Sequence, residues 1–258
     1  MKFYRLCKML SILILFLFVT STCAPATSIV IPTSVVTSTS MPPTVTSAPR
    51  TVTFMTPDGT ALEGKLSGSG DTAVIFSVMG NCKKGWEDMA DLVAKNGMTA
   101  LTYQWRGCRR SGLVDEEEIQ KFVDDLRGAI NFMRAQDIMK IILAGASLGG
   151  SASAKLMVES QADGVIVIAS PAAISQWSFE VESADVNSGV PKLFITAESD
   201  TTVPANETRH LYDLAAEPKE WQTYPGTAHG TDLFEGENGE ELEQRILKFI
   251  LGVLAKEK

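Results

Sequence analysis

The first 57 residues of this chain contain no aspartate or glutamate, and the first acidic residue is Asp58. The whole chain has 258 residues, 45% of them apolar, and a formal net charge of −8. Residues 51–258 hold 19 Lys and Arg against all 31 Asp and Glu, which gives this part a net charge of −12. Nucleic acid is therefore not expected as a partner, because phosphate binding requires a basic surface.

The N-terminus has no apolar run long enough to cross a bilayer, which takes about 20 residues. Its apolar run, Met9–Val19, has 11 residues and follows the basic residues Lys2, Arg5 and Lys8. A short apolar core behind a positively charged start is the pattern of a secretion signal. We therefore predict a signal peptide over residues 1–22.

Thr20-Ser21-Thr22-Cys23 follows the apolar core and resembles a bacterial lipobox, in which the cysteine after the cleavage site is acylated. We predict lipidation of Cys23 and a location at the outer face of the cytoplasmic membrane or in the cell envelope. The usual motif has Leu three places before the cysteine and Gly or Ala directly before it, and this sequence has neither. The alternative is ordinary cleavage near Ala24 or Ala26, with Cys23 incidental.

Residues 24–49 carry no charge, and 11 of them are Ser or Thr and five are Pro. Such a segment buries too little apolar surface to offset its ordering entropy, so we predict a disordered tether over residues 23–50. As a flexible coil it would reach about 25–30 Å, which suits a link between a membrane and a folded domain at residues 51–258. A tail without such a role is the alternative.

The acidic domain alternates strand patterns with helix patterns, and its first two strands flank the turn Pro57-Asp58-Gly59. Alternation of this kind predicts an α/β fold, with a mostly parallel central sheet and helices on both faces. The predicted strands are Thr51–Met55, Ala61–Leu66, Ala73–Val78, Thr99–Tyr103, Ile141–Ala144, Gly164–Ala169, Lys192–Thr196 and Glu220–Tyr224. The predicted helices are Glu87–Asn96, Glu116–Gln136, Leu148–Glu159, Glu207–Ala216 and Gly239–Lys256.

Ligands of such sheets bind beyond the carboxyl ends of the strands, so the residues that follow strands are the candidates for a site. Ser147 stands in the G-x-S-x-G segment Gly145–Gly149, between a predicted strand and a predicted helix. The glycines permit a sharp turn that exposes the serine at its tip, next to a helix N-terminus. Ser147 is therefore the candidate nucleophile.

An acid and a histidine follow two later strands. Asp200 is placed to hold an imidazole in one tautomer, with Glu198 as a nearby competitor and helix capping as the alternative role of Asp200. The chain has only two histidines, and His210 lies in a polar helix where we expect it to be solvated. His229, in a glycine-flanked loop after the last strand, is the candidate general base.

The order Ser147, Asp200, His229, together with the turn motif and the alternating strands, resembles the α/β-hydrolase superfamily over residues 51–258. The best-known members of its dienelactone-hydrolase-like branch carry a cysteine nucleophile, whereas this chain has Ser147, so lactone specificity does not carry over. Three further segments carry the resemblance: Gln104–Gly112, similar to the family's D-x-R-G-x-G-x-S loop, and Pro191–Ile195 and Tyr224–Phe234, similar to that branch.

The resemblance implies an exported serine hydrolase that cleaves small-molecule carboxylic esters through an acyl-enzyme, without a cofactor. The alternatives are a peptidase or acyltransferase on cell-envelope material, and a non-catalytic binding protein that retains the fold. We expect a monomer. The oxyanion hole would use the backbone N–H of Leu148 and one from the loop after Val78. The family usually has His-Gly there, whereas this chain has Met79-Gly80-Asn81, so Gly80 and Asn81 both remain candidates.

The sequence has four cysteines, and neither a CxxC pair nor a Cys/His cluster indicates a metal site. Cys7 leaves with the signal peptide. If Cys23 is lipidated, Cys82 and Cys108 remain as an even pair in an oxidising compartment, each just after a strand. We predict a disulfide between them that fixes the oxyanion loop, with two free thiols as the alternative.

Family lids enter between the strands that end at Ala169 and begin at Lys192, where this chain has only 22 residues, so we predict an open site. Three aromatic side chains are candidates for an apolar acyl pocket, with ordinary packing as the alternative: Trp86, Trp177 and Phe179. Three arginines are candidates for binding a substrate carboxylate: Arg106, Arg109 and Arg110. The alternative is a structural Arg106 with the other two solvated.

Overall fold

The computed structural model describes residues 48–79, 85–108 and 116–255. Several predictions lie outside the described residues and stay predictions. These are the signal peptide, the tether up to residue 47, and the roles of Cys23, Gly80, Asn81, Cys82, Arg109 and Arg110.

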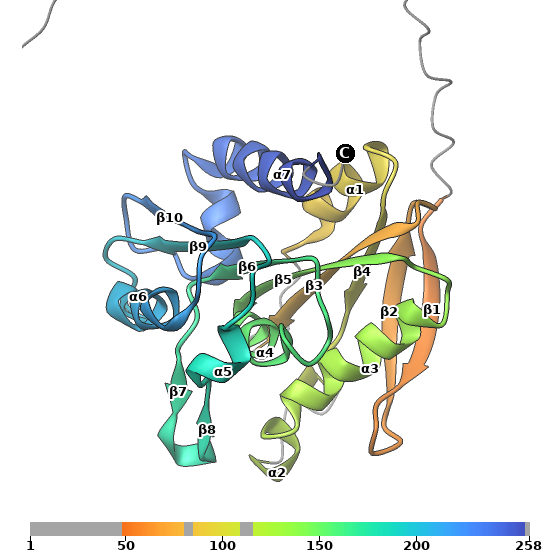
Figure 1. The fold of residues 1–258 in the computed structure, drawn as a ribbon, viewed down its shortest axis with the longest axis horizontal. Helices are drawn as coiled ribbons and strands as arrows, with labels where there is room; N and C mark the ends of the chain where they lie inside the picture. The colour runs from red at the N-terminus through yellow and green to blue at the C-terminus, as the bar shows by residue number, and fades with distance from the viewer. Residues whose placement is uncertain (1–47, 80–84, 109–115, 256–258) are drawn as a thin grey trace, which may run out of the picture. The chain divides into compact units, whose positions relative to one another are not determined.

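Eight strands of the described part form one sheet in the order β1-β2-β4-β3-β5-β6-β9-β10 (Figure 1). Strand β2 is antiparallel to its neighbours β1 and β4, and the other neighbouring pairs are parallel. This confirms the predicted hairpin and the mostly parallel sheet. The strands are β1 (Arg50–Met55), β2 (Ala61–Ser67), β3 (Thr72–Met79), β4 (Thr99–Tyr103), β5 (Lys140–Ser147), β6 (Gly164–Ile168), β9 (Lys192–Ala197) and β10 (Lys219–Tyr224).

Helices cover both faces of this sheet (Figure 1), and each face has its own apolar core. Strand β3 shows the division, because Ala73 and Ile75 point into one core while Val74 and Phe76 point into the other. One face carries α1 (Glu87–Lys95) and α7 (Gly239–Ala255), and the other carries α3 (Phe122–Arg134), α4 (Leu148–Leu156) and α6 (Ala205–Leu214). Burial on both faces explains the continuous apolar runs of the central strands.

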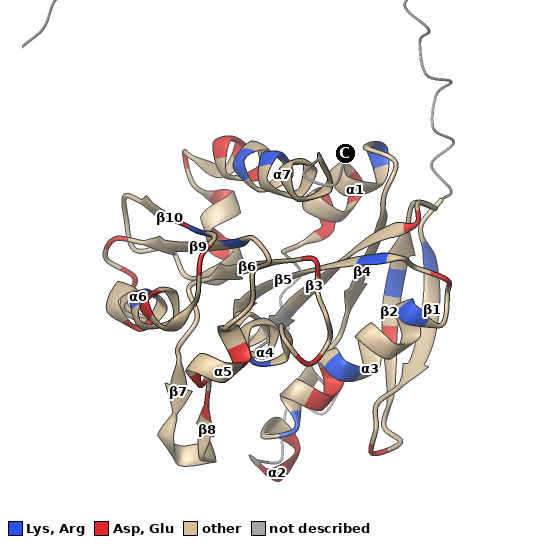
Figure 2. Ribbon diagram, viewed as in Figure 1, with Lys and Arg blue, Asp and Glu red and all other residues tan. Residues whose placement is uncertain are grey.

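Charges at both ends of α1 and at the start of α7 follow the helix dipole (Figure 2). Helix α1 begins with Glu87 and Asp88 and ends with Lys95. Helix α7 carries Glu240 and Glu241 in its first turn. Part of the acidity of the domain therefore stabilises its helices.

The prediction of one long helix over residues 116–136 was wrong. The structure has a short helix α2 (Glu116–Ile119), then a turn at Gln120 and Lys121, and then α3. At the break, Lys121 Nζ lies 2.8 Å from Glu118 Oε1 and 3.8 Å from Asp58 Oδ2. A two-residue turn hardly shifts the phase of the apolar pattern, so the sequence does not reveal it.

The segment between β6 and β9 is small, as its length predicted. It contains a two-stranded hairpin, β7 (Ala173–Ile174) and β8 (Phe179–Glu180), with a 3₁₀ turn η2 (Ser175–Trp177) between them and the short helix α5 (Ser183–Val186) after them. These elements form no lid domain within the described residues.

Candidate active site

Ser147 ends β5 at a sharp turn into α4. Its φ of 54° and ψ of −128° lie outside the regions that non-glycine residues prefer. The flanking glycines are required by close backbone contacts, because a Cβ on Gly145 would overlap the Gly149 carbonyl oxygen and one on Gly149 would overlap that of Ser77. The turn therefore presents the Ser147 hydroxyl in a strained geometry that the packing around it maintains.

His229 links the serine to the acid. Its Nε2 lies 3.0 Å from Ser147 Oγ, and its Nδ1 lies 2.8 Å from Asp200 Oδ2. The Asp200 side chain is fully buried, and that of His229 is 17% exposed. A buried carboxylate on Nδ1 leaves Nε2 as the acceptor for the serine proton.

Asp200 is fixed by the turn that follows β9. The backbone N–H groups of Thr202 and Val203 donate to Asp200 Oδ1 over 2.8 and 3.0 Å, which leaves Oδ2 for His229. The competing acid Glu198 is exposed, and so is the second histidine, His210. The structure thus places Asp200 rather than Glu198 beside His229.

Leu148 is the first residue of α4. Its backbone N–H has no acceptor within the helix, because the first N–H groups of a helix never do. It stands next to Ser147, where a predicted oxyanion donor belongs. The second predicted donor, Gly80 or Asn81, lies outside the described residues.

A buried hydrogen bond supports the turn from below, and sequence reasoning missed it. Tyr103 Oη and Ser77 Oγ are 2.9 Å apart, and burial raises the pKa of Tyr103 above its ordinary value. The carbonyl of Ser77 is the group against which Gly149 packs. Tyr103, at the end of β4, thereby helps to fix Ser77, the residue that packs against the turn at Ser147.

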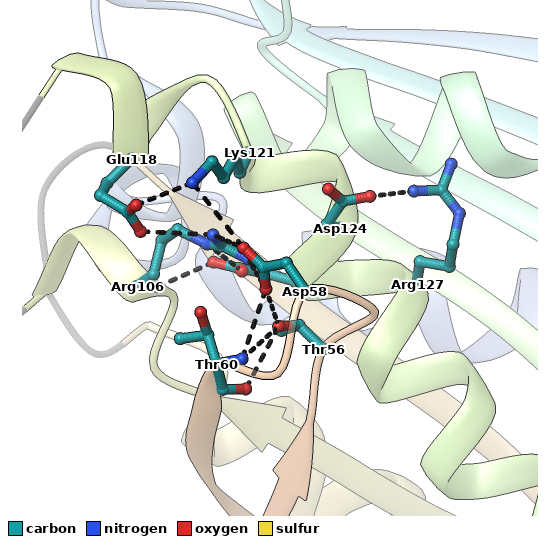
Figure 3. Close-up of polar contacts among 9 residues, drawn as sticks. Thr56, Asp58, Thr60, Arg106, Glu118, Lys121, Asp124 and Arg127 are labelled. Atoms are coloured by element: carbon teal, nitrogen blue, oxygen red, sulfur yellow. Dashed lines mark hydrogen bonds and ion pairs between the residues drawn. The ribbon is translucent and has the colours of Figure 1, made fainter.

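Arg106, in the 3₁₀ turn η1 (Arg106–Cys108), belongs to a buried ion-pair network (Figure 3). Its Nε donates to Asp125 Oδ1 over 2.6 Å, and its Nη1 and Nη2 donate to the two carboxylate oxygens of Asp58 over 2.8 and 3.2 Å. Nη1 also reaches Glu118 Oε2 at 3.3 Å. Of the two roles considered for Arg106, the structure supports the structural one and not the binding of a substrate carboxylate, because the guanidinium is buried and already paired.

The network joins segments that are far apart in the sequence. The backbone N–H of Arg106 donates to Asp125 Oδ2 over 2.8 Å, so α3 holds both the side chain and the main chain of η1. The Arg106 guanidinium holds the pKa of Asp58 well below its usual value. Asp58 was predicted only as a turn residue, and its second role depends on a partner 48 residues away.

Cys108 is disulfide-bonded. The three other cysteines of the chain lie outside the described residues, so the pairing with Cys82 stays a prediction. Cys108 closes η1, and its backbone N–H donates to the Trp105 carbonyl over 3.0 Å. The Arg106 network therefore anchors one end of this crosslink.

The three aromatic candidates for an acyl pocket have packing partners of their own. Trp86 is only 2% exposed and lies between Phe76 and Phe234, with ring centroids 4.9 and 5.3 Å away. Trp86 therefore has the ordinary packing role that was the alternative to lining an acyl pocket. Trp177 and Phe179, in the β7–β8 hairpin, are half-buried and pack on Phe122 of α3 at 6.1 and 5.0 Å.

No group of three or more His, Cys, Asp or Glu within the described residues is arranged to hold a metal ion. In the same part of the chain, no helix combines the length and apolarity that a membrane crossing requires.

Comparison with known proteins agrees with this fold. Residues 72–184 match the family model described as serine aminopeptidase, S33. YfhR of Escherichia coli K12, named as an uncharacterized protein, is 26% identical over 234 residues, which cover 79% of this chain and 81% of YfhR.

Solved structures give the same picture. The esterase domain of a Rhodothermus marinus protein has a TM-score of 0.61 at 18% identity, over 81% of this chain and 98% of that domain. The Pyrococcus furiosus esterase Pf2001 has a TM-score of 0.64 at 18% identity, over 79% of this chain and 91% of the esterase. An alpha-beta serine hydrolase homologue from Coxiella burnetii has a TM-score of 0.59 at 19% identity, over 77% of this chain and 96% of the homologue.

The narrower resemblance to the dienelactone-hydrolase-like branch stays a prediction. The sheet order, the turn at Ser147 and the solved neighbours agree on one point, which is that the chain has the α/β-hydrolase fold.

Proposed function

We propose that this protein is an exported serine hydrolase that cleaves small carboxylic esters through an acyl-enzyme. The observation that carries the proposal is the chain of contacts from Ser147 Oγ through the His229 ring to Asp200, with distances of 3.0 and 2.8 Å. Nucleophile, base and orienting acid stand in the order that acyl transfer requires. The esterase names of two solved neighbours agree with it.

The steps follow from the geometry. Ser147 Oγ attacks the ester carbonyl carbon while His229 Nε2 takes the hydroxyl proton. The tetrahedral intermediate then expels the alcohol, which receives that proton from His229. A water molecule, deprotonated by His229, attacks the acyl-enzyme and releases the carboxylic acid and free Ser147. Asp200 stabilises the imidazolium at each stage and stays ionised.

The negative charge on the carbonyl oxygen needs two preorganised donors. We assign one to the backbone N–H of Leu148, which also benefits from the dipole of α4. The other comes from the loop after β3, at Gly80 or Asn81. Loss of one such donor typically costs about 2.7–4 kcal/mol of transition-state stabilisation.

Turnover of p-nitrophenyl esters tests the proposal. The wild type should hydrolyse p-nitrophenyl acetate or butyrate, and Ser147→Ala should lose that activity while its circular dichroism stays unchanged. Asp213→Asn, which changes an exposed acid of α6 outside the site, is the matched control and should keep full activity. An inactive wild type would favour the non-catalytic binding protein.

A peptidase is the second candidate, because the family model that matches residues 72–184 is described as a serine aminopeptidase. An acyltransferase on cell-envelope material would use the same acyl-enzyme with an alcohol or amine acceptor in place of water. Aminoacyl p-nitroanilides assayed beside the esters separate the first of these activities. Product analysis with added acceptor alcohols separates the second.

We also propose that the protein is held outside the cytoplasmic membrane by a lipid on Cys23. The basic start, the short apolar core and the uncharged Ser/Thr/Pro-rich segment support this location. Metabolic labelling with an alkyne fatty acid should mark the wild type and leave Cys23→Ala unmarked. Equal labelling of both proteins, or labelling of neither, would contradict the anchor.

A further inference from the structure

The 3₁₀ turn η3 (Gly230–Glu235) follows the base directly and contacts other parts of the candidate site. His229 is the residue at its N-terminal end, and the backbone N–H of Asp232 donates to the His229 carbonyl over 3.0 Å. The position of His229 therefore depends on where η3 sits. Gly230, at a φ of +58°, faces Ala146, the residue before the nucleophile, and a Cβ there would lie 3.7 Å from Ala146 Cβ.

The second contact of η3 is with Gly85, where the described chain resumes after the loop that follows β3. A Cβ on Gly85 would lie only 2.5 Å from Thr231 Cβ and 3.0 Å from Thr231 Cγ2. Ordinary van der Waals contacts of a Cβ begin near 3.4 Å. Thr231 is buried and its side chain is short and β-branched, so it has no freedom to swing away. Only glycine fits at position 85 with η3 in this place.

Neighbouring contacts keep both partners where they are. Trp86, next to Gly85, packs its ring against Phe234 of η3 and against Phe76 of β3. At its other end η3 packs against the start of α7. Gly239 permits this contact, because a side chain there would overlap the Phe234 carbonyl oxygen. The contact between Gly85 and Thr231 is thus supported by packing on both sides.

We propose that Gly85 and Thr231 are positioning residues, whose close contact sets the distance between the turn that holds His229 and the return of the loop after β3. The inference rests on the proposed function and extends it to residues that touch neither substrate nor the reacting atoms. A methyl group at position 85 forces the two segments apart by about 1 Å, and misplacement on that scale lowers turnover by about 10²-fold.

The test is the ester assay on four proteins: wild type, Gly85→Ala, Thr231→Gly, and the double variant. Gly85→Ala should lower kcat by about 10²-fold with little change in KM, because the groups that act in the transition state are displaced. Thr231→Gly removes the three side-chain atoms that the added methyl would meet, so the double variant should recover most of the lost kcat. Gly189→Ala is the matched control, since a Cβ there meets nothing within 4 Å, and its kcat should not change.

The outcomes separate this inference from the proposed function. An inactive wild type overturns the proposed function and this inference with it. An active wild type with Gly85→Ala as active as Gly189→Ala overturns the positioning role alone. If Gly85→Ala fails to fold, the double variant decides, because recovery of both fold and kcat supports the inference and recovery of fold without kcat overturns it.

Discussion

Arg106→Met should be among the most destabilising substitutions in this domain. The side chains of Arg106 and Asp125 are both 0% exposed, and the guanidinium is the partner of Asp125 Oδ1. Methionine fills much of the same volume but leaves the Asp125 carboxylate buried, with only the backbone N–H of residue 106 as a donor. Breaking a buried ion pair in this way costs about 3–5 kcal/mol of unfolding free energy.

The double variant Arg106→Met/Asp125→Leu tests whether that loss of stability comes from the unpaired Asp125 carboxylate or from the lost ion pair itself. If the cost arises from an uncompensated buried charge, removing the second charge relieves it. The double variant should therefore be more stable than Arg106→Met alone, although the Arg106 backbone N–H then loses its acceptor. The sum of the two single effects should exceed the double effect by more than about 1 kcal/mol.

Urea unfolding followed by tryptophan fluorescence measures these free energies, with Arg209→Met as the control. Arg209 pairs with Asp213 at the surface, where the two side chains are 50% and 57% exposed. Exposed pairs of this kind contribute about 1 kcal/mol or less. An Arg106→Met variant that loses no more stability than Arg209→Met would refute the role given to the network.

Three further predictions concern stability and covalent structure. The free energy of unfolding of the wild type should exceed that of Asp58→Asn by about 2 kcal/mol at pH 7. Because folding lowers the pKa of Asp58, this difference should shrink as the pH falls below about 4, which urea titrations at several pH values would measure. Ser147→Gly should be about 1 kcal/mol more stable than Ser147→Ala in thermal unfolding, because only glycine relieves the strain at a φ of 54°. Peptide mapping of the unreduced protein should find Cys108 joined to Cys82; a link from Cys108 to Cys23 would exclude the predicted pairing.

The candidate triad could be predicted from the sequence because each of its members lies at the carboxyl end of a strand or in the loop after it. Parallel strands bring their carboxyl ends to one edge of the sheet. Ser147, Asp200 and His229 meet there because β5, β9 and β10 lie close together in the strand order. The G-x-S-x-G motif adds a local reason to predict the nucleophile, because any side chain in place of Gly145 or Gly149 would overlap neighbouring backbone atoms. Local chemistry and topology agree here, and this agreement made the prediction specific.

The remaining features depend on contacts that no local pattern encodes. Asp58 reads as a turn residue until Arg106, 48 positions later, is packed against it. The break between α2 and α3 keeps the apolar phase, and Lys121 at the break pairs with Glu118 and with the distant Asp58. Trp86 was a candidate pocket residue, yet in the structure it is buried and packs edge-on against Phe234. Side-chain pairing across the fold decides such positions.

Covalent labelling of Ser147 tests the central claim most directly. A fluorophosphonate reacts with a serine that a neighbouring base has activated, and peptide mass spectrometry then locates the adduct. The account predicts one adduct per chain on the peptide that contains Ser147, and its loss in Ser147→Ala and in His229→Asn. An unlabelled wild type, or equal labelling of wild type and His229→Asn, would contradict a nucleophile activated by His229.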